Sequence, residues 1–271
     1  NNPMFTAMPT PVRVFYNADG DGDCPLTVRE GRSWLSNEFE TEPQIKEFPC
    51  KNIDDEIDNP ALSLKELWFR YEKDTPDILR GVSLEIPASS ITAIVGGNGA
   101  GKSTTLKAIC GICKPYRGKI KVFGKAVNKF KSGELFKNCI SMLPQDPKSL
   151  FVKKTVHEDL EEMTKDKNKI TEIAETCQIA ELMNNHPYDL SGGEQQRAAL
   201  AKVLLTEPKI LLLDEHTAAL DPRSADIVMN LTDKIVKEKN LTAIMVTHNL
   251  RYAVDYGNRA IMLHDGNIIM D

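Results

Sequence analysis

One glycine-rich segment constrains this chain more than any other feature. It reads Gly96-Gly-Asn-Gly-Ala-Gly101-Lys102-Ser103 and fits the phosphate-binding loop pattern in full. A compact β-branched run precedes it at 90–95, and a predicted helix follows over 102–112. In that context glycines let backbone N–H groups turn toward phosphates, and the helix N-terminus adds partial positive charge. The segment therefore predicts an α/β protein that binds ATP.

The residues of this loop have distinct expected roles. Lys102 is expected to bridge the β- and γ-phosphates and to act in catalysis, and the Ser103 hydroxyl is expected to reach Mg²⁺. Further contacts to the nucleotide are expected from the rest of the loop and the first turn of the helix: Gly96, Asn98, Gly99, Ala100, Gly101 and Thr104. A glycine-rich turn without a ligand is the alternative, and the strand–loop–helix context disfavours it.

A second motif is an apolar strand that ends in two acids, Ile210-Leu-Leu-Leu-Asp214-Glu215. A buried strand rarely ends in two carboxylates without a cation to balance them. We expect Asp214 to hold Mg²⁺ through water and Glu215 to polarise the attacking water as general base. The alternative is an ordinary strand end with solvated acids. The phosphate-binding loop in the same chain favours the catalytic interpretation.

From residue 61 onward, predicted strands alternate with predicted helices, which favours an α/β core with a largely parallel sheet. Strands are predicted at 61–71, 78–86, 90–95, 119–122, 140–143, 210–213 and 242–246, with a hairpin at 260–264 and 268–270. Helices are predicted at 102–112, about 155–184, 191–204, 221–238 and 249–256. We divide the chain into an acidic linker or appendage at 1–60 and a domain at 61–271.

Residues 1–60 contain seven prolines and little periodic apolar pattern, which favours a linker with one short helix near 26–35. They carry twelve acidic and five basic side chains, so the remainder of a chain of net charge −5 is nearly neutral. Asp19-Gly-Asp-Gly-Asp23 departs from a calcium loop because Cys24 stands where glycine is required, so we predict a solvated turn.

Composition narrows the function further. The longest apolar runs are far shorter than the roughly 18 residues of a membrane span, and the N-terminus lacks signal-peptide character. We expect a peripheral protein at the cytoplasmic face of the membrane, acting through a partner. A broad basic surface for nucleic acid is not expected, although a local patch remains possible.

Cys110 and Cys113 have redox or zinc spacing but fall in a helical apolar pattern, which favours small buried side chains.

The segment Leu190-Ser-Gly-Gly-Glu-Gln-Gln-Arg197 resembles the signature motif of ABC ATPases, and its Ser191 lies 23 residues before Asp214. Ser191 and Glu194 also form a predicted capping box at a helix start. The resemblance implies that Ser191 and Gly193 complete the ATP site of a partner subunit. It further implies a P-loop NTPase core with a mainly parallel sheet, a small antiparallel β part and an α-helical subdomain at about 146–190.

Other positions resemble the family one by one. Tyr71 resembles the aromatic residue that stacks on adenine, with Trp68 and Phe69 as rivals. Gln145 resembles the glutamine that touches Mg²⁺ and senses the transmembrane partner, and His248 resembles the switch histidine that contacts the γ-phosphate.

Two further positions flank the second motif. Asp221 resembles the aspartate of the loop that contacts the other subunit, and it is also a predicted N-cap. His216 departs from the family, which usually has proline there; we expect only a small effect on loop rigidity.

The branch of the family is indicated by spacing and by local sequence. Only 46 residues separate Gln145 from Ser191, which excludes the coiled-coil ATPases of chromosome maintenance. The stretch 145–151, with Thr155-Val156, resembles energy-coupling-factor ATPases, which drive vitamin and cobalt or nickel uptake. Leu150 and Phe151 then lie either near the groove for a coupling helix or in the core.

The segment 24–35 resembles the connector of tandem ATPases in this branch, so we expect the second half of a double-domain protein. The expected partners are a second ABC ATPase domain, as homodimer or tandem half, and an integral membrane subunit. The alternatives are a soluble ABC ATPase outside transport and a regulatory half that binds ATP without turnover.

Overall fold

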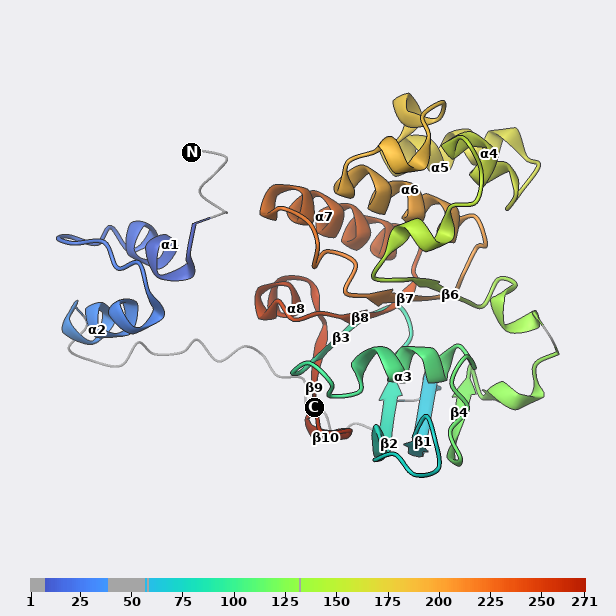
Figure 1. Ribbon diagram of the computed structural model, residues 1–271, viewed down its shortest axis with the longest axis horizontal. Helices are drawn as coiled ribbons and strands as arrows, with labels where there is room; N and C mark the ends of the chain where they lie inside the picture. Colours follow the sequence, from blue (N-terminus) through green and yellow to red (C-terminus); the bar gives the residue numbers. More distant parts are fainter. Residues whose placement is uncertain (1–7, 39–56, 58, 132) are drawn as a thin grey trace.

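The computed structural model describes residues 8–38, 57, 59–131 and 133–271, and its elements are labelled in Figure 1. Within this part the strands form two sheets. The larger has the order β10-β9-β3-β8-β7-β6, and every neighbouring pair in it is parallel except β10 with β9. Its strands are β3 (Ile91–Val95), β6 (Ile140–Leu143), β7 (Ile210–Asp214), β8 (Thr242–Val246), β9 (Arg259–His264) and β10 (Asn267–Met270). The mainly parallel sheet predicted from the sequence is confirmed.

The central strands β3, β7 and β8 are buried at every position, because helices cover both faces of the large sheet. On one face lies α3 (Lys102–Ile109), which packs between the two sheets. On the other face lie α6 (Gly192–Leu204), α7 (Pro222–Glu238) and α8 (Leu250–Tyr256). The strand–helix alternation of the sequence thus produces a layered α/β core.

The smaller sheet is antiparallel and has the order β2-β1-β4-β5. It consists of β1 (Leu62–Phe69), β2 (Leu79–Ile86), β4 (Arg117–Val122) and β5 (Lys125–Ala126). The 3₁₀ turns η2 (Val127–Lys129) and η3 (Glu134–Phe136) follow it. β1 ends two residues before the predicted limit, and its register shifts at a bulge next to Glu66, whose φ is 51°.

The segment between β6 and β7 is helical. It contains η4 (Pro147–Leu150), α4 (Val156–Glu161), α5 (Lys167–Thr176), η5 (Ala180–Leu182), η6 (Pro187–Asp189) and α6. The helical stretch predicted over about 155–184 is divided into shorter helices, because Asp166 starts a new helix by accepting hydrogen bonds from two backbone N–H groups. The predicted helix 102–112 is also too long: α3 ends at Ile109, and Gly111 follows with φ of 73°.

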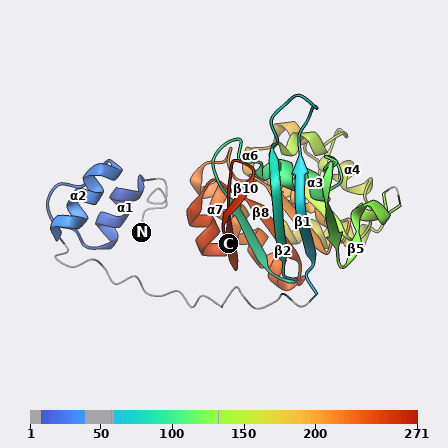
Figure 2. The ribbon, with the colours of Figure 1, turned by 90° about the horizontal axis from the view of Figure 1, so that it is seen from below.

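The N-terminal region differs from the expected linker. It forms two helices, α1 (Thr10–Asn17) and α2 (Val28–Glu38), which pack side by side on the side of α7 (Figure 2). Phe15 is buried, and its ring centroid lies 5.1 Å from that of Trp34. The predicted helix near 26–35 corresponds to α2, whereas α1 was not predicted. Most of the predicted linker beyond Glu38 lies outside the described residues.

Candidate nucleotide-binding site

The parallel sheet brings four separate loops to one edge. The glycine-rich loop follows β3, Asp214 ends β7, and Thr247 and His248 follow β8. Gln145 follows β6. In open α/β sheets, ligands bind at the carboxyl ends of the strands. The topology therefore gathers segments that are more than one hundred residues apart in the chain.

The glycines of the loop have conformations that other residues rarely adopt. Gly96 has φ of 151°, and a Cβ at this position would stand 2.1 Å from the carbonyl oxygen of Leu263. Gly101 has φ of 99° and is the N-cap of α3. The loop thus runs close against the end of β9 and leads directly into the helix N-terminus, which favours anions.

Lys102 is buried under this loop, with a relative exposure of 5%. Its ammonium group donates to the carbonyl oxygens of Gly96 and Gly97, at 3.1 and 2.9 Å, and lies 3.7 Å from a carboxylate oxygen of Glu215. These bonds hold the cation inside the curve of the loop and next to the acidic end of β7.

Ser103 and Asp214 are joined directly. The Ser103 hydroxyl donates to Oδ1 of Asp214 at 2.7 Å. Burial raises the pKa of the Asp214 carboxyl, although the bond from Ser103 opposes the shift. A buried carboxylate and a hydroxyl in contact are a donor set that suits a hard divalent cation such as Mg²⁺.

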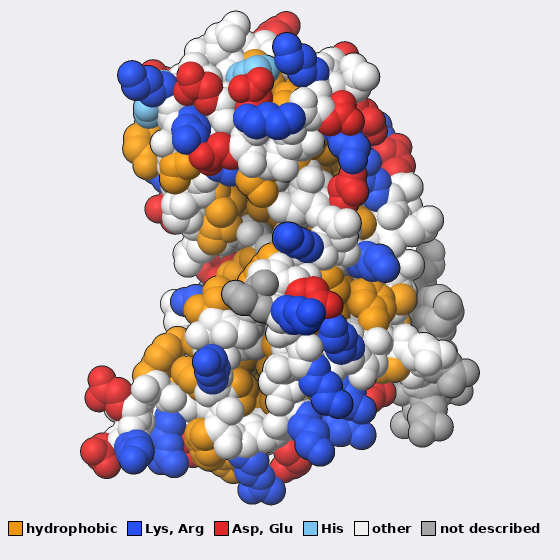
Figure 3. All heavy atoms as spheres, turned by 90° about the vertical axis from the view of Figure 1, so that its right-hand side faces the viewer, with side chains coloured by type: hydrophobic (Ala, Val, Ile, Leu, Met, Phe, Trp, Pro, Cys, Tyr) orange, Lys and Arg blue, Asp and Glu red, His pale blue; other side chains and the backbone are white. Residues whose placement is uncertain are grey.

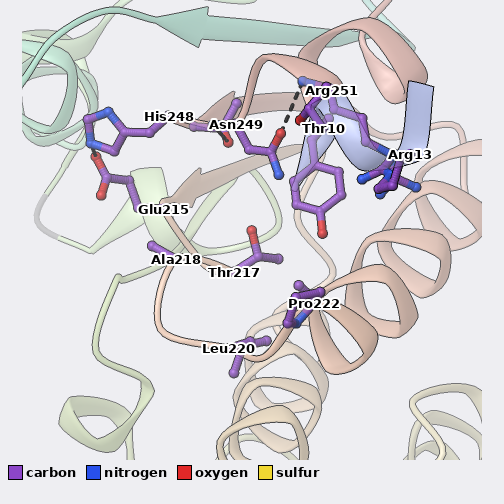
Figure 4. Close-up of a pocket in the computed structure, with 13 residues that line it drawn as sticks. Thr10, Arg13, Glu215, Thr217, Ala218, Leu220, Pro222, His248, Asn249 and Arg251 are labelled. Carbon is purple, nitrogen blue, oxygen red and sulfur yellow. Dashed lines mark hydrogen bonds and ion pairs between the residues drawn. The ribbon is translucent and has the colours of Figure 1, made fainter. Parts of the chain in front are cut away.

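Glu215 occupies a strained position at the centre of the cluster. Its φ is 46°, which is unusual for a residue with a side chain. Nε2 of His248 lies 2.5 Å from its Oε1 (Figure 4). Backbone strain at such a position often accompanies function, since the surrounding structure must impose it.

Two other predicted contacts lie at the border of this cluster. The Tyr71 side chain is 59% exposed, and its hydroxyl oxygen lies 3.5 Å from Oγ1 of Thr104 at the start of α3. Of the two other candidates for stacking on adenine, Phe69 is buried in the core and Trp68 lies under Arg117.

Gln145 is exposed beyond the end of β6, and in the described chain no hydrogen bond or ion pair joins its side chain to the cluster.

The predicted signature segment forms a separate feature at the start of α6. Ser191 accepts a hydrogen bond from Glu194 N–H, and the Glu194 carboxylate accepts from Ser191, which completes the predicted capping box. Gly193 faces α7, where a Cβ would stand 3.1 Å from Cβ of Ser224. Close packing of two helices therefore already accounts for this glycine. The helix that they begin, α6, lies on the helical side of the molecule, away from α3 (Figure 1).

The structure also locates the cysteine pair, the predicted N-cap at Asp221 and Phe151. Cys110 and Cys113 are buried, and burial raises the pKa of the Cys110 thiol to about 12, as expected for small core residues. Asp221 caps α7 by accepting from Arg223 N–H and Ser224 N–H. Phe151 is buried in the core, which favours the packing interpretation of that side chain.

Sequence reasoning noted His216 but not its burial, and it missed the contribution of α1 beside the site. His216 is 1% exposed, both of its ring nitrogens are buried without a partner among the described residues, and burial lowers its pKa to about 4. A cavity of about 700 Å³ beside Glu215 and His248 is lined by Arg251 and, from α1, by Arg13 (Figure 4). Arg13 was not predicted as a residue near the site, because its segment was interpreted as a linker.

The fold and the cluster define a P-loop nucleotide-binding domain: a glycine-rich loop, a buried lysine and two acids at the end of a neighbouring parallel strand. The family model for ABC transporters matches residues 79–218. The chain belongs to the ABC transporter ATP-binding family, whose members are ATPases.

Sequence relatives and solved structures agree with this family assignment. The chain is 38% identical over 255 residues to an ABC transporter ATP-binding protein of Bacillus cereus, covering 92% of this chain but only 45% of that protein. It is 34% identical to the energy-coupling factor transporter ATP-binding protein EcfA2 of Ligilactobacillus salivarius, covering 78% of each. The structure of cbiO1 from Clostridium perfringens, described as part of the ABC transporter complex cbiONQ, superposes with a TM-score of 0.72 at 30% identity and covers 79% of this chain and 88% of that one.

The resemblance to the energy-coupling-factor branch is thereby confirmed. The chain spans about half the length of the Bacillus relatives that it matches. None of the helices in the described residues is long and apolar enough to cross a membrane.

Proposed function

We propose that this chain is the ATP-hydrolysing domain of an energy-coupling-factor type importer. The observation that supports it best is the convergence of Lys102 and Ser103 with Asp214, Glu215 and His248 at one edge of the sheet. A buried cation, a hydroxyl–carboxylate pair and a glutamate in contact with a histidine are the groups that phosphoryl transfer to water requires.

In this proposal the residues of the site divide the work of binding ATP, holding Mg²⁺ and activating water. Lys102 and the loop amides bind the phosphates of ATP, Tyr71 stacks on the adenine, and Ser103, Asp214 and Gln145 hold Mg²⁺. The metal, when bound, neutralises negative charge on the phosphates. Glu215 orients water and accepts its proton, and His248 holds Glu215 in position and contacts the γ-phosphate.

The direct test is Glu215→Gln. The amide keeps the size of the side chain but is a far weaker base, so turnover of ATP should be abolished while binding of ATP with Mg²⁺ persists. Unchanged hydrolysis would remove Glu215 from its role. Loss of binding together with turnover would show only that the site had been damaged, so equilibrium binding must accompany the assay.

We also propose two partners. Ser191 and Gly193 begin α6, which covers the opposite face of the large sheet from α3 and its Lys102. We therefore assign them to the ATP site of a second ABC ATPase domain, either in a homodimer or as the other half of a tandem chain. The greater length of the Bacillus relatives supports the tandem arrangement. The domain division at 61–271, with an appendage at 1–60, belongs to the same proposal. A preceding ATPase domain in the upstream reading frame is expected, and its absence would refute the tandem form.

The second partner is an integral membrane subunit, which places the chain at the cytoplasmic face of the membrane. The relatives are named as an energy-coupling factor transporter ATP-binding protein and as part of the ABC transporter complex cbiONQ. Uptake of cobalt, nickel or a vitamin is what the resemblance to this branch implies. Copurification with a membrane protein would distinguish this proposal from the alternative, a soluble ABC ATPase outside transport.

A further inference from the structure

The region around the β4–β5 hairpin concentrates positive charge in a chain that is acidic overall. Residues 114–137 contain seven lysines, one arginine and a single acid, Glu134, whereas the whole chain has a net charge of −5. This region lies at the right-hand side of Figure 1. Figure 3 faces that side and shows Lys and Arg gathered over its lower half, with apolar side chains between them. We call residues 114–137 the basic hairpin.

The turn of this hairpin carries a residue that the turn does not favour. Phe123 and Gly124 link β4 to β5 with φ of 45° and 76°. Two-residue turns with positive φ at both positions favour Asn, Asp and Gly, and a bulky residue there is an outlier. The Phe123 side chain is also 44% exposed. Packing in the core therefore does not account for its presence at the tip.

One lysine lies over this aromatic ring, and two others face each other on the sheet that leads to it. The Lys209 ammonium lies 5.8 Å from the centre of the Phe123 ring. Lys119 on β4 is paired directly with Lys65 on β1, and Lys121 follows on the same exposed face of the sheet. Like charges directly opposite each other destabilise a sheet. Two locally unfavourable features, a strained exposed phenylalanine and facing cations, thus coincide on one surface.

We propose that the basic hairpin docks on an anionic phospholipid surface. Lysines near such a surface are attracted to its headgroups, and an exposed aromatic tip can enter the boundary between headgroups and acyl chains. Seven lysines against one arginine favour headgroups over a nucleic-acid backbone, for which the planar arginine fork is the preferred contact. The proposal rests on the membrane location given under the proposed function, and it does not depend on ATP hydrolysis.

The test uses the whole chain without nucleotide, sedimented with vesicles of phosphatidylcholine alone or with added phosphatidylglycerol. Binding is expected only with phosphatidylglycerol, and it should weaken as salt rises. Lys119→Glu with Lys121→Glu should lower the partition coefficient at least about tenfold, since each lysine near the surface contributes about a fivefold factor. The matched control, Lys165→Glu with Lys167→Glu on the helical subdomain, should change it less than about twofold.

Phe123→Asn separates binding from folding. Asn suits the turn, so the midpoint of thermal unfolding should hold or rise while vesicle binding falls several-fold. In Phe123→Trp, the added tryptophan emission should shift to the blue with phosphatidylglycerol vesicles and not with phosphatidylcholine.

Three results would each overturn the proposal: no binding to phosphatidylglycerol vesicles, an equal loss of binding in the control variant, or tighter binding to a short RNA duplex than to vesicles. Glu215→Gln should bind vesicles normally, so failure of this proposal and failure of the ATPase assignment give different results.

Discussion

Nε2 of His248 lies 2.5 Å from Oε1 of Glu215, and the same carboxylate oxygen lies 3.7 Å from the ammonium group of Lys102. Glu215 is therefore held from two sides, by one residue that follows β8 and another that begins α3. Two side chains from different elements thus help to position this carboxylate on a backbone with positive φ.

His248→Ala should reduce the rate of ATP hydrolysis by about 100-fold or more, because Glu215 loses the contact that fixes it. The affinity for ATP should change far less, since Lys102 and the loop amides remain. The measurements are single-turnover hydrolysis and equilibrium binding. His157→Ala, on α4, is the control and should leave both unchanged. A normal rate for His248→Ala would show that Glu215 is positioned without the histidine.

Ser103→Ala should weaken Mg²⁺-dependent binding of ATP while leaving metal-free binding largely unchanged. The variant removes the hydroxyl that donates to Asp214 at 2.7 Å and leaves a buried carboxylate without that bond. Ser103→Thr keeps the hydroxyl and should restore the dependence on Mg²⁺. The measurement is the affinity for ATP, titrated for each variant with Mg²⁺ and again with EDTA in place of the metal. If alanine and threonine behaved alike, the hydroxyl would have no part in holding the metal.

Acid should destabilise the fold through His216. Burial lowers the pKa of this side chain to about 4 from its ordinary value of 6.5, so the folded form keeps it neutral where the unfolded chain takes up a proton. The free energy of unfolding should therefore be unaffected above pH 6.5 and fall by roughly 3 kcal/mol as pH drops toward 4.

His216→Leu should remove this part of the pH dependence, and it should not leave a polar atom unpaired. Urea unfolding at several pH values between 4 and 8 measures the slope. A variant with the same slope as the parent chain would place the acid sensitivity elsewhere.

A buried ion pair anchors the loop that precedes α4. Lys202 of α6 donates to Asp159 at 2.6 Å and to the carbonyl oxygen of Leu150 at 2.7 Å, and Asp159 accepts from the backbone N–H groups of Val152 and Lys153. Asp159 is 0% exposed.

Lys202→Met should lower the free energy of unfolding by about 3–5 kcal/mol, because it leaves a buried carboxylate without its cation. Adding Asp159→Leu should recover much of this loss, since two apolar groups replace the pair. Chemical denaturation of the two single variants and the double variant measures these changes in the free energy of unfolding. Equal stability of Lys202→Met and the parent chain would contradict the expectation.

The parts of the site that could be predicted from sequence are those fixed by local chemistry. A loop that needs positive φ at Gly101 must contain glycine, and the end of β7 carries its two acids within one apolar run. The capping box at Ser191 is equally local, and its predicted helix start agrees with α6 to within one residue.

The parts that could not be predicted depend on tertiary contacts or on competing local signals. The break before α5 is caused by Asp166, whose capping role was hidden in a continuous polar pattern. The burial of His216 depends on what packs around it, and residue type alone favours exposure. The contribution of Arg13 to the cavity required knowledge of where α1 lies relative to β8.

The Asp159–Lys202 pair also has a mechanical consequence. It ties Leu150, Val152 and Lys153 to the last turn of α6, so we expect this stretch of chain and that helix to move together. The Val152 side chain is 69% exposed. We expect a displacement applied at Val152 to reach the last turn of α6 and, through that helix, its N-cap Ser191.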